Sequence, residues 1–327
     1  RSTNRTGITV CMPDLSNDAT RRHLQSGWAE RVGQGAVSEA RRAGRSVTII
    51  PPKQLDESAL AEFRIAPPGG LVIADLAASA DVLDRIVELG PELACPVVAY
   101  GSHPRWTDFD RVVSDHRHGA ALLYDWLWQR GRRRIMLVLG PISSEKRPWM
   151  TQRIAGYRDA AARLGGDYDN VVHISEQPNH DRRLGAEGLA DDARHLVGHL
   201  AVHLTGPDAA DAIMCASDGQ AITVAAACRQ LHLEPGEDVA VVGYDNYWRD
   251  VPHRRFEPYV PPATVDKRNT ETGAAMVRLM LDRMDGKLPD EPLVRRIEPV
   301  LVKTDEADAA SITEPWHVPE RMKGEEP

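Results

Sequence analysis

Residues 211–246 read DAIMCASDGQAITVAAACRQLHLEPGEDVAVVGYDN, and the pattern of this stretch decides the fold. Ala212 to Ala216 is a short apolar run, which is typical of a buried parallel strand. Apolar residues then recur at helical spacing from Gln220 to Leu231, and Pro235-Gly236 ends that helix. Val239 to Val242 is a second apolar run. The stretch therefore predicts a strand, a helix and a second parallel strand.

Polar residues follow both predicted strands: Ser217-Asp218 after the first and Asp245-Asn246 after the second. In an open parallel sheet, ligands bind outside the carboxyl ends of the strands. These residues therefore predict one wall of a small-molecule cleft. The carboxylate of Asp245 can accept two hydrogen bonds from ligand hydroxyls, and a capping role in the turn is the structural alternative. Asp218 is expected to cap the helix that follows it.

The same alternation of strands and helices runs through both halves of the chain, and it predicts two doubly wound α/β lobes with parallel sheets and a cleft between them. The first lobe is expected to comprise residues 1–131 and 263–298, and the second residues 132–262 and 299–304. Residues 305–327 are polar, acidic and dotted with proline, so we expect a mobile tail there.

Composition narrows the class of protein. The chain has 327 residues, 42% of them hydrophobic, which is enough for two cores. Its net charge of −8 argues against a DNA-binding surface on these residues, because phosphate contacts need a basic patch. No apolar run approaches the length of a membrane helix, and no signal peptide is visible. The four scattered cysteines predict buried thiols in a reducing compartment rather than disulfides (Cys11, Cys95, Cys215 and Cys228).

Short motifs along residues 7–304 resemble one family. They are Val113-Ser114-Asp115 with Gly119, Gly140-Pro141, Arg153-Ile154-Ala155-Gly156-Tyr157, the Val-Val-Gly-Tyr-Asp run that ends at Asp245, and Pro261-Pro262-Ala263-Thr264-Val265. In this order, the motifs resemble the effector domain of the LacI/GalR family of bacterial transcription regulators. The resemblance implies a periplasmic-binding-protein-like fold of type I. It also implies a homodimer in the cytoplasm, a sugar-like effector, and operator DNA bound through a helix-turn-helix headpiece that these residues lack.

The resemblance also implies the ligand-binding residues. It directs Asp115, Arg153 and Asp245 to the effector, although Asp115 could equally be a helix cap and Arg153 could form a salt bridge between lobes. Ser217 stands where the family often has Asn, which changes the ligand geometry. Lys267 stands where the family frequently has Gln, so it would either favour an acidic or phosphorylated ligand or remain solvated.

Three further residues are weaker candidates for the same site. Trp149 precedes Arg153 and could stack on a sugar face, or it could be a core or surface tryptophan. Leu15 and Ser16 follow the first predicted strand and are candidates from the first lobe.

We identify no catalytic residue, metal ligand or cofactor motif in the sequence, because it holds no P-loop, no GxGxxG after a strand and no GxSxG. His195, His199 and His203 share a helix face, and we interpret that face as solvated. The expected protein is not an enzyme. The main alternative is a secreted sugar-binding protein for uptake, which would share the fold and the cleft.

Overall fold

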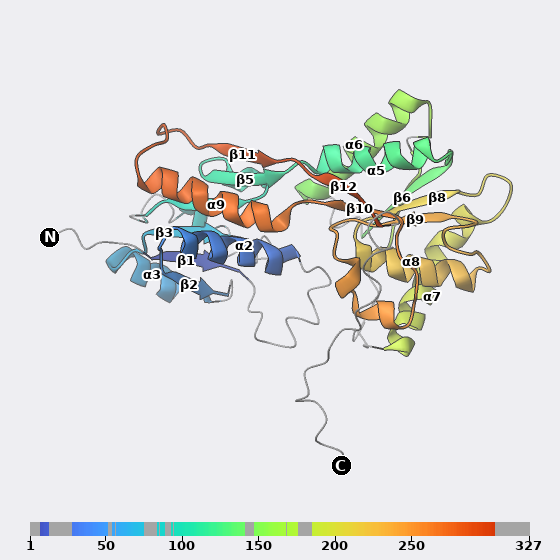
Figure 1. The fold of residues 1–327 in the computed structure, drawn as a ribbon, viewed down its shortest axis with the longest axis horizontal. Coiled ribbons are helices and arrows are strands. Elements are labelled where there is room, and N and C mark those ends of the chain that lie inside the picture. Colours follow the sequence, from blue (N-terminus) through green and yellow to red (C-terminus); the bar gives the residue numbers. More distant parts are fainter. Residues whose placement is uncertain are drawn as a thin grey trace, which may run out of the picture.

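Two parallel sheets, each covered by helices, form the protein in a computed structural model. The structure describes residues 7–12, 28–51, 54–55, 57–74, 84, 86–88, 93, 95–140, 147–167, 169–175 and 185–304. Figure 1 shows the two sheets side by side along the long axis of the molecule, with a two-stranded ribbon between them. This α/β architecture is the one that the sequence predicts.

The first sheet has six parallel strands. Their order is β11 (Val294–Ile297), β5 (Asp110–Ser114), β4 (Val97–Tyr100), β3 (Gly70–Ile73), β1 (Ile8–Cys11) and β2 (Val47–Ile50). Its helices are α2 (Trp28–Arg42), α3 (Glu57–Ile65) and α9 (Asn269–Met284). We call this sheet and its helices the first lobe.

The second sheet has four parallel strands, in the order β7 (Val171–His173), β6 (Ile135–Leu139), β8 (Ala212–Cys215) and β9 (Ala240–Val242). The helix α8 (Asp218–Gln230) joins β8 to β9, which confirms the unit predicted from residues 211–246. The other helices are α5 (His116–Gln129), α6 (Pro148–Leu164) and α7 (Ala186–Leu204). This sheet and these four helices form the second lobe.

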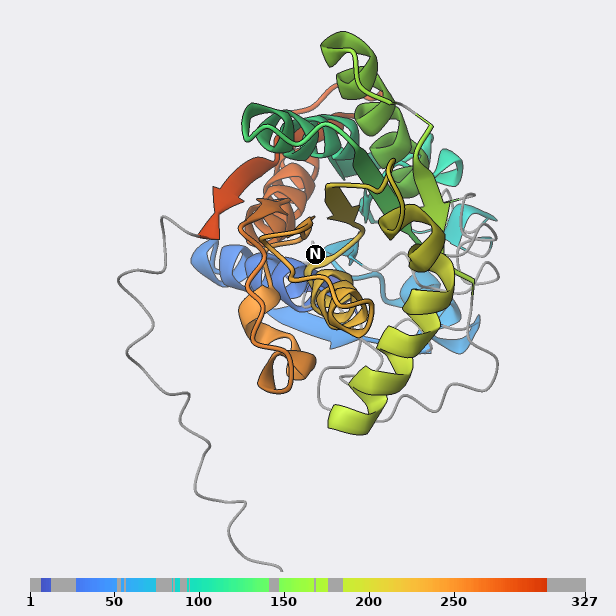
Figure 2. The same cartoon turned by 90° about the vertical axis from the view of Figure 1, so that its right-hand side faces the viewer.

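Successive residues of the central strands point to opposite faces of each sheet, and both faces are covered by apolar clusters. In β6, Ile135 and Leu137 face a cluster shared with α5 and α6, whereas Met136 and Val138 face a cluster shared with α7 and α8. Figure 2 shows these two helix pairs on opposite sides of the second sheet. In β3 of the first lobe, Val72 likewise belongs to one cluster, whereas its neighbours Leu71 and Ile73 both belong to another. Such two-sided burial explains why these strands read as continuous apolar runs.

The antiparallel ribbon of β10 (Ala263–Asp266) and β12 (Val300–Lys303) belongs to the core of the second lobe. Ala263 and Val265 pack in the cluster of α5 and α6, and Ala263 accepts a backbone hydrogen bond from Gly243, which follows β9. This packing associates α5 and β10 with the second sheet. The lobe boundaries predicted after residues 131 and 262 stay a prediction.

Helices α2 and α9 cross closely through glycines. A Cβ on Gly273 of α9 would lie 1.9 Å from the carbonyl oxygen of Val32 in α2. A Cβ on Gly35 of α2 would lie 1.9 Å from the carbonyl oxygen of Thr270 in α9. Because both obstacles are backbone atoms, no side-chain rotation relieves them.

We therefore expect Gly273→Ala to lower the free energy of unfolding by about 2–3 kcal/mol through overpacking. The matched control is Gly198→Ala, an exposed site in α7 where the described residues leave the space around a new Cβ open to 4 Å. Alanine there should stabilise the helix by about 0.5–1 kcal/mol. Urea unfolding of both variants measures the difference. Equal effects at the two sites would contradict the close crossing.

Candidate functional site

Asp245 lies in a backbone turn directly after β9. Its φ is 90° and that of Asn246 is 52°, so two consecutive non-glycine residues occupy the left-handed region. Hydrogen bonds hold this turn against β10: Asp245 N–H donates to Val265 O at 2.8 Å, and Asn246 N–H donates to Thr264 Oγ1 at 3.2 Å. The Asn246 side chain also donates to Asp266 Oδ2 at 3.1 Å. The surroundings thus fix the direction of the Asp245 carboxylate in a strained conformation.

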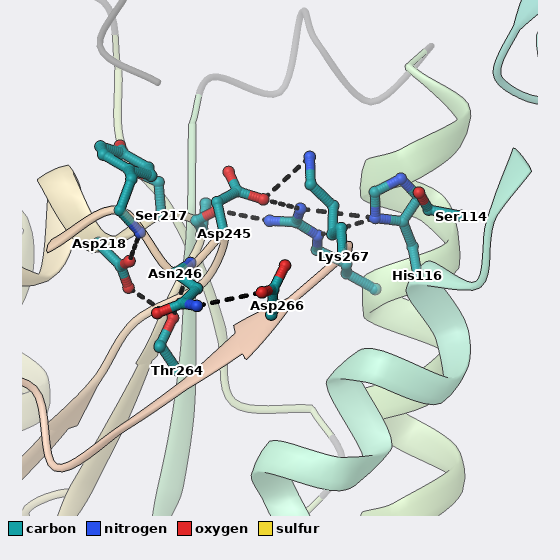
Figure 3. Close-up of polar contacts among 12 residues, drawn as sticks. Ser114, His116, Ser217, Asp218, Asp245, Asn246, Thr264, Asp266 and Lys267 are labelled. Carbon is teal, nitrogen blue, oxygen red and sulfur yellow. Dashed lines mark hydrogen bonds and ion pairs between the residues drawn. The ribbon is translucent and has the colours of Figure 1, made fainter. Parts of the chain in front are cut away.

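Two cations flank this carboxylate. Lys267 Nζ lies 2.9 Å from Asp245 Oδ1, and Arg153 Nη2 lies 3.6 Å from the same oxygen (Figure 3). All three side chains are buried, at 4% exposure for Arg153, 6% for Lys267 and 7% for Asp245. Among the described residues, Asp245 Oδ1 receives no directed hydrogen bond. Its contacts are therefore ion pairs, and the oxygen keeps the capacity to accept a hydrogen bond from a ligand.

The guanidinium of Arg153 is held on several sides. Its Nη1 donates to the carbonyl oxygen of Ala216, directly after β8, and its Nε lies 3.4 Å from His116 Nδ1. Its Cζ lies 3.5 Å from the ring centre of Tyr244 and 4.6 Å from that of Trp149. A planar cation suits such stacking and forked hydrogen bonding. The contacts of Arg153 with the rest of the protein therefore fix the orientation of its guanidinium.

His116 begins α5 and is buried against Arg153. Burial lowers the pKa of His116 well below its usual value, and the charges of Arg153 and Lys267 lower it further. The imidazole is consequently neutral at physiological pH. A neutral ring can accept a hydrogen bond at Nδ1 from Arg153, so His116 helps to hold the guanidinium without adding charge.

The first lobe completes the surroundings of Lys267. Its ammonium lies 5.4 Å from the ring centre of Trp28 in α2, and Trp28 packs at 5.8 Å against Tyr100 at the end of β4. The Tyr100 hydroxyl lies 3.3 Å from Ser114 Oγ at the end of β5. The carboxyl ends of strands from both sheets thus meet around Asp245, which is where open α/β sheets bind ligands.

Ser217 and Asp218 follow β8, and the structure places them in different settings. The prediction that Asp218 caps α8 is wrong: Ser217 is the N-cap, and its Oγ accepts from Gln220 N–H at 3.1 Å. Asp218 is instead buried below the turn. Its Oδ2 accepts from the N–H groups of Tyr247 at 2.6 Å and Trp248 at 3.0 Å, and Thr264 Oγ1 donates to Oδ1 at 2.7 Å.

Burial raises the pKa of Asp218 to about 7, although the hydrogen bonds from Thr264 and Tyr247 N–H oppose that shift. The three donors to Asp218 are the N–H groups of Tyr247 and Trp248, which follow the Asp245 turn, and the hydroxyl of Thr264 in β10, which is bonded to the turn. Asp218 therefore supports the turn from beneath.

The other predicted ligand residues lie in different settings. Asp115 is the N-cap of α5: Oδ1 accepts from His118 N–H at 2.9 Å, and Oδ2 pairs with Arg296 at 3.0 Å. Its role as a ligand contact, like that of Ser217, stays a prediction. Trp149 lies beside Arg153 and His116, with its ring centre 6.4 Å from that of the imidazole. Leu15 and Ser16 fall outside the described residues.

Side chains of the two lobes form hydrogen bonds with each other. Arg31 of α2 donates to Asn246 O at 2.7 Å and to Asp250 Oδ2 at 3.2 Å. Gln152 of α6 donates to Ser102 Oγ at 2.9 Å. These contacts join residues that are far apart in sequence and connect α2 directly to the Asp245 turn.

Two kinds of feature are absent from the described residues. No described helix is long and apolar enough to cross a membrane. No group of three or more His, Cys, Asp or Glu side chains in the described part of the chain is arranged to hold a metal ion.

The sequence of the chain matches a known family and several known proteins. Residues 124–304 match the periplasmic binding protein-like domain family. The HTH-type transcriptional regulator CelR of Thermobifida fusca is 28% identical over 208 residues, which cover 62% of this chain and 54% of that protein. The HTH-type transcriptional regulator reg1 of Streptomyces lividans is 33% identical over 185 residues, which cover 54% of this chain and 46% of that protein. The chain thus spans about half the length of the curated relatives it matches.

Solved structures share the fold. A structure of the transcriptional regulator CelR in complex with cellobiose has a TM-score of 0.67 at 21% identity, covering 91% of this chain and 83% of that chain. A LacI family transcriptional regulator from Enterococcus faecium with bound ribose has a TM-score of 0.62 at 19% identity, covering 91% of this chain and 97% of that chain. The relatives are transcription regulators rather than enzymes.

Proposed function

This chain belongs to the periplasmic binding protein-like domain family, and from that premise we propose that it is the effector-binding part of a LacI-type transcription regulator. The effector is a sugar or sugar derivative, and it binds between the lobes at Asp245, Arg153 and Lys267. The sugars named for two structural neighbours, cellobiose and ribose, support this class of ligand.

One observation carries the proposal: a buried carboxylate, held in a strained turn, lies between two buried cations where the strand ends of both sheets meet. A polyol needs acceptors and donors within reach of neighbouring hydroxyls. Asp245 supplies the acceptor, and Arg153 supplies donors in a fixed fork. Trp149 and Tyr244 add ring faces beside the same guanidinium.

Regulation follows from the position of this site between lobes. A ligand that touches both lobes binds the closed arrangement more tightly than an open one, and it therefore shifts the population toward closure. In a homodimer, such a movement would change the spacing of two DNA-binding headpieces and with it the affinity for operator DNA. The headpiece, the dimer and the cytoplasmic location are parts of this proposal. Reading the coding sequence upstream of Arg1 for a helix-turn-helix tests the first of them.

Replacing Arg153 tests the ligand site. Arg153→Met keeps much of the side-chain volume and removes every donor, so we expect a loss of sugar affinity of about 10–100-fold, since a hydrogen bond to a charged group contributes about 1.5–3 kcal/mol. Isothermal titration calorimetry with cellobiose, ribose and other neutral sugars measures it. Arg163→Met is the matched control, because Arg163 lies on the same helix, is 55% exposed and pairs only with Asp125 among the ion pairs described. If Arg153→Met and Asp245→Ala both leave the affinity unchanged, the site is elsewhere.

A further inference from the structure

The buried cluster around Asp245 has an excess of positive charge. Arg153 and Lys267 each carry one positive charge, and Asp245 carries the single negative charge between them. His116 and Tyr244 also contact Arg153, and both are neutral at physiological pH, because burial strongly lowers the pKa of His116 and raises the pKa of Tyr244. A buried charge without a counter-charge is unfavourable.

Neighbouring carboxylates do not balance this excess. Asp115 is paired with Arg296. Asp266 accepts hydrogen bonds from the Asn246 side chain and from the backbone N–H of Arg268. Asp218 is turned away from both cations, toward Tyr247 N–H and Thr264. Figure 3 shows Asp218 on the side of the Asp245 turn away from His116.

Lys267 is the group whose charge is least satisfied. Arg153 has a carbonyl acceptor, a ring nitrogen and two aromatic faces, as well as Asp245. An ammonium has three donors, and the contacts described for Lys267 are the ion pair with Asp245 and the face of Trp28. At 6% side-chain exposure, water cannot freely solvate it. The structure therefore removes the solvated-lysine alternative that the sequence left open.

We propose that the effector carries a negatively charged group, a carboxylate or a phosphate, which pairs with Lys267 while its hydroxyls donate to Asp245. This inference rests on the proposed function, because it assigns the class of sugar derivative to the same site. A bound anion brings the cluster to two positive and two negative charges. Lys267 lies between Asp245 of the second lobe and Trp28 of the first, so the anion is held where the lobes meet.

The test compares matched neutral and anionic sugars by isothermal titration calorimetry in 0.15 M salt. The probes are cellobiose with cellobionate, ribose with ribose 5-phosphate, and glucose with glucuronate and glucose 6-phosphate. We expect at least one anionic probe to bind about tenfold or more tightly than its neutral parent, as a charge-assisted hydrogen bond provides. Comparing the affinities of the carboxylate probes with those of the phosphate probes shows which of the two anions the site binds.

Variants of Lys267 test whether this residue causes the preference for anionic sugars. Lys267→Gln should abolish the preference for the anion, and Lys267→Arg should retain a part of it. Lys287→Gln makes the same change of charge at a lysine that is 62% exposed, at the end of α9, and should leave the preference intact. Thermal unfolding of each variant verifies folding, and Lys267→Arg keeps the test valid if Lys267→Gln unfolds.

Three results would overturn the proposal, and they differ in what else they reject. Neutral sugars that bind as tightly as their anionic derivatives reject the anionic ligand and leave the proposed function standing. An anion preference that survives Lys267→Gln rejects Lys267 as its source. If no probe of either kind binds, the sugar-binding function itself fails, and this inference fails with it.

Discussion

Replacing Asp245 with alanine should lower the free energy of unfolding by about 3–5 kcal/mol and abolish measurable sugar binding. The reason for the first effect is electrostatic: Lys267 and Arg153, 2.9 Å and 3.6 Å from Asp245 Oδ1, would remain buried without the carboxylate they share. Removing one partner of a buried ion pair is strongly destabilising because it leaves an uncompensated charge. Urea unfolding at pH 7 measures the stability, and calorimetry measures the binding.

The double variant Asp245→Ala/Lys267→Met is the control that separates charge from packing. Removal of both partners should cost less than removal of Asp245 alone, because one unpaired cation disappears with its carboxylate. If the double variant loses as much stability as the sum of the two single variants, the ion pair contributes nothing. Asp245 would then act only through the geometry of its turn.

The second large effect is expected at Asp218. Asp218→Ala deletes the acceptor of two backbone N–H groups and of the Thr264 hydroxyl, all at a fully buried site. Each buried donor left without a partner costs about 1–3 kcal/mol, so we expect a loss of about 3–5 kcal/mol in urea unfolding. Asp218→Asn should lose much less. Its oxygen can accept from both N–H groups, and its amide can donate to Thr264 Oγ1.

Asp218 also makes the free energy of unfolding depend on pH. With a pKa raised to about 7, the Asp218 carboxyl keeps its proton in the folded protein up to about pH 7, whereas the unfolded chain loses it near its usual value of 3.8. Between these values the folded state binds more protons. The free energy of unfolding therefore falls as the pH rises from about 4 to about 7, and it is level above that range.

Asparagine does not titrate, so subtracting the stability of Asp218→Asn from that of the wild type isolates this contribution. The difference should decrease from pH 5 to pH 7 and then remain constant. A difference that is independent of pH, or that increases with pH, would contradict a protonated Asp218.

The central elements could be predicted from sequence because they are buried on both faces. The apolar runs that became β6, β8 and β9 are short and end at turn residues, which favours buried strands, and the intervening helices follow their 3.6-residue period. The edge strand β11 was missed. Its sequence Val294-Arg295-Arg296-Ile297 has two adjacent basic residues between two apolar ones at a half-exposed edge, so it forms no apolar run. Helix α3 was missed as well, since its apolar residues are interrupted by charges.

Helix starts were less accurate than helix centres. Helix α6 begins at Pro148, because proline fits the first turn of a helix. Ser217, not Asp218, caps α8, and two polar residues in succession gave no means to choose between them. The buried carboxylate of Asp218 accepts hydrogen bonds from residues 29, 30 and 46 positions later in the chain. No local sequence pattern indicates such long-range contacts.

The candidate site was predictable in its charged residues but not in its environment. The motifs singled out Arg153, Asp245 and Lys267, and the fold brings these three together. The contribution of His116 was missed, because its neutrality depends on burial against two cations. The position of Lys267 was undecidable from sequence, since a lysine after a strand is exposed or buried according to what packs over it. Here Trp28, from the other lobe, lies over the ammonium.

A crystal structure of the chain with the sugar or sugar derivative that binds most tightly tests the central claim most directly. We expect electron density for the ligand between the lobes, with a hydroxyl within hydrogen-bonding distance of the Asp245 carboxylate and an oxygen within hydrogen-bonding distance of the Arg153 guanidinium. A ligand bound elsewhere, with Asp245, Arg153 and Lys267 in their present contacts, would contradict it.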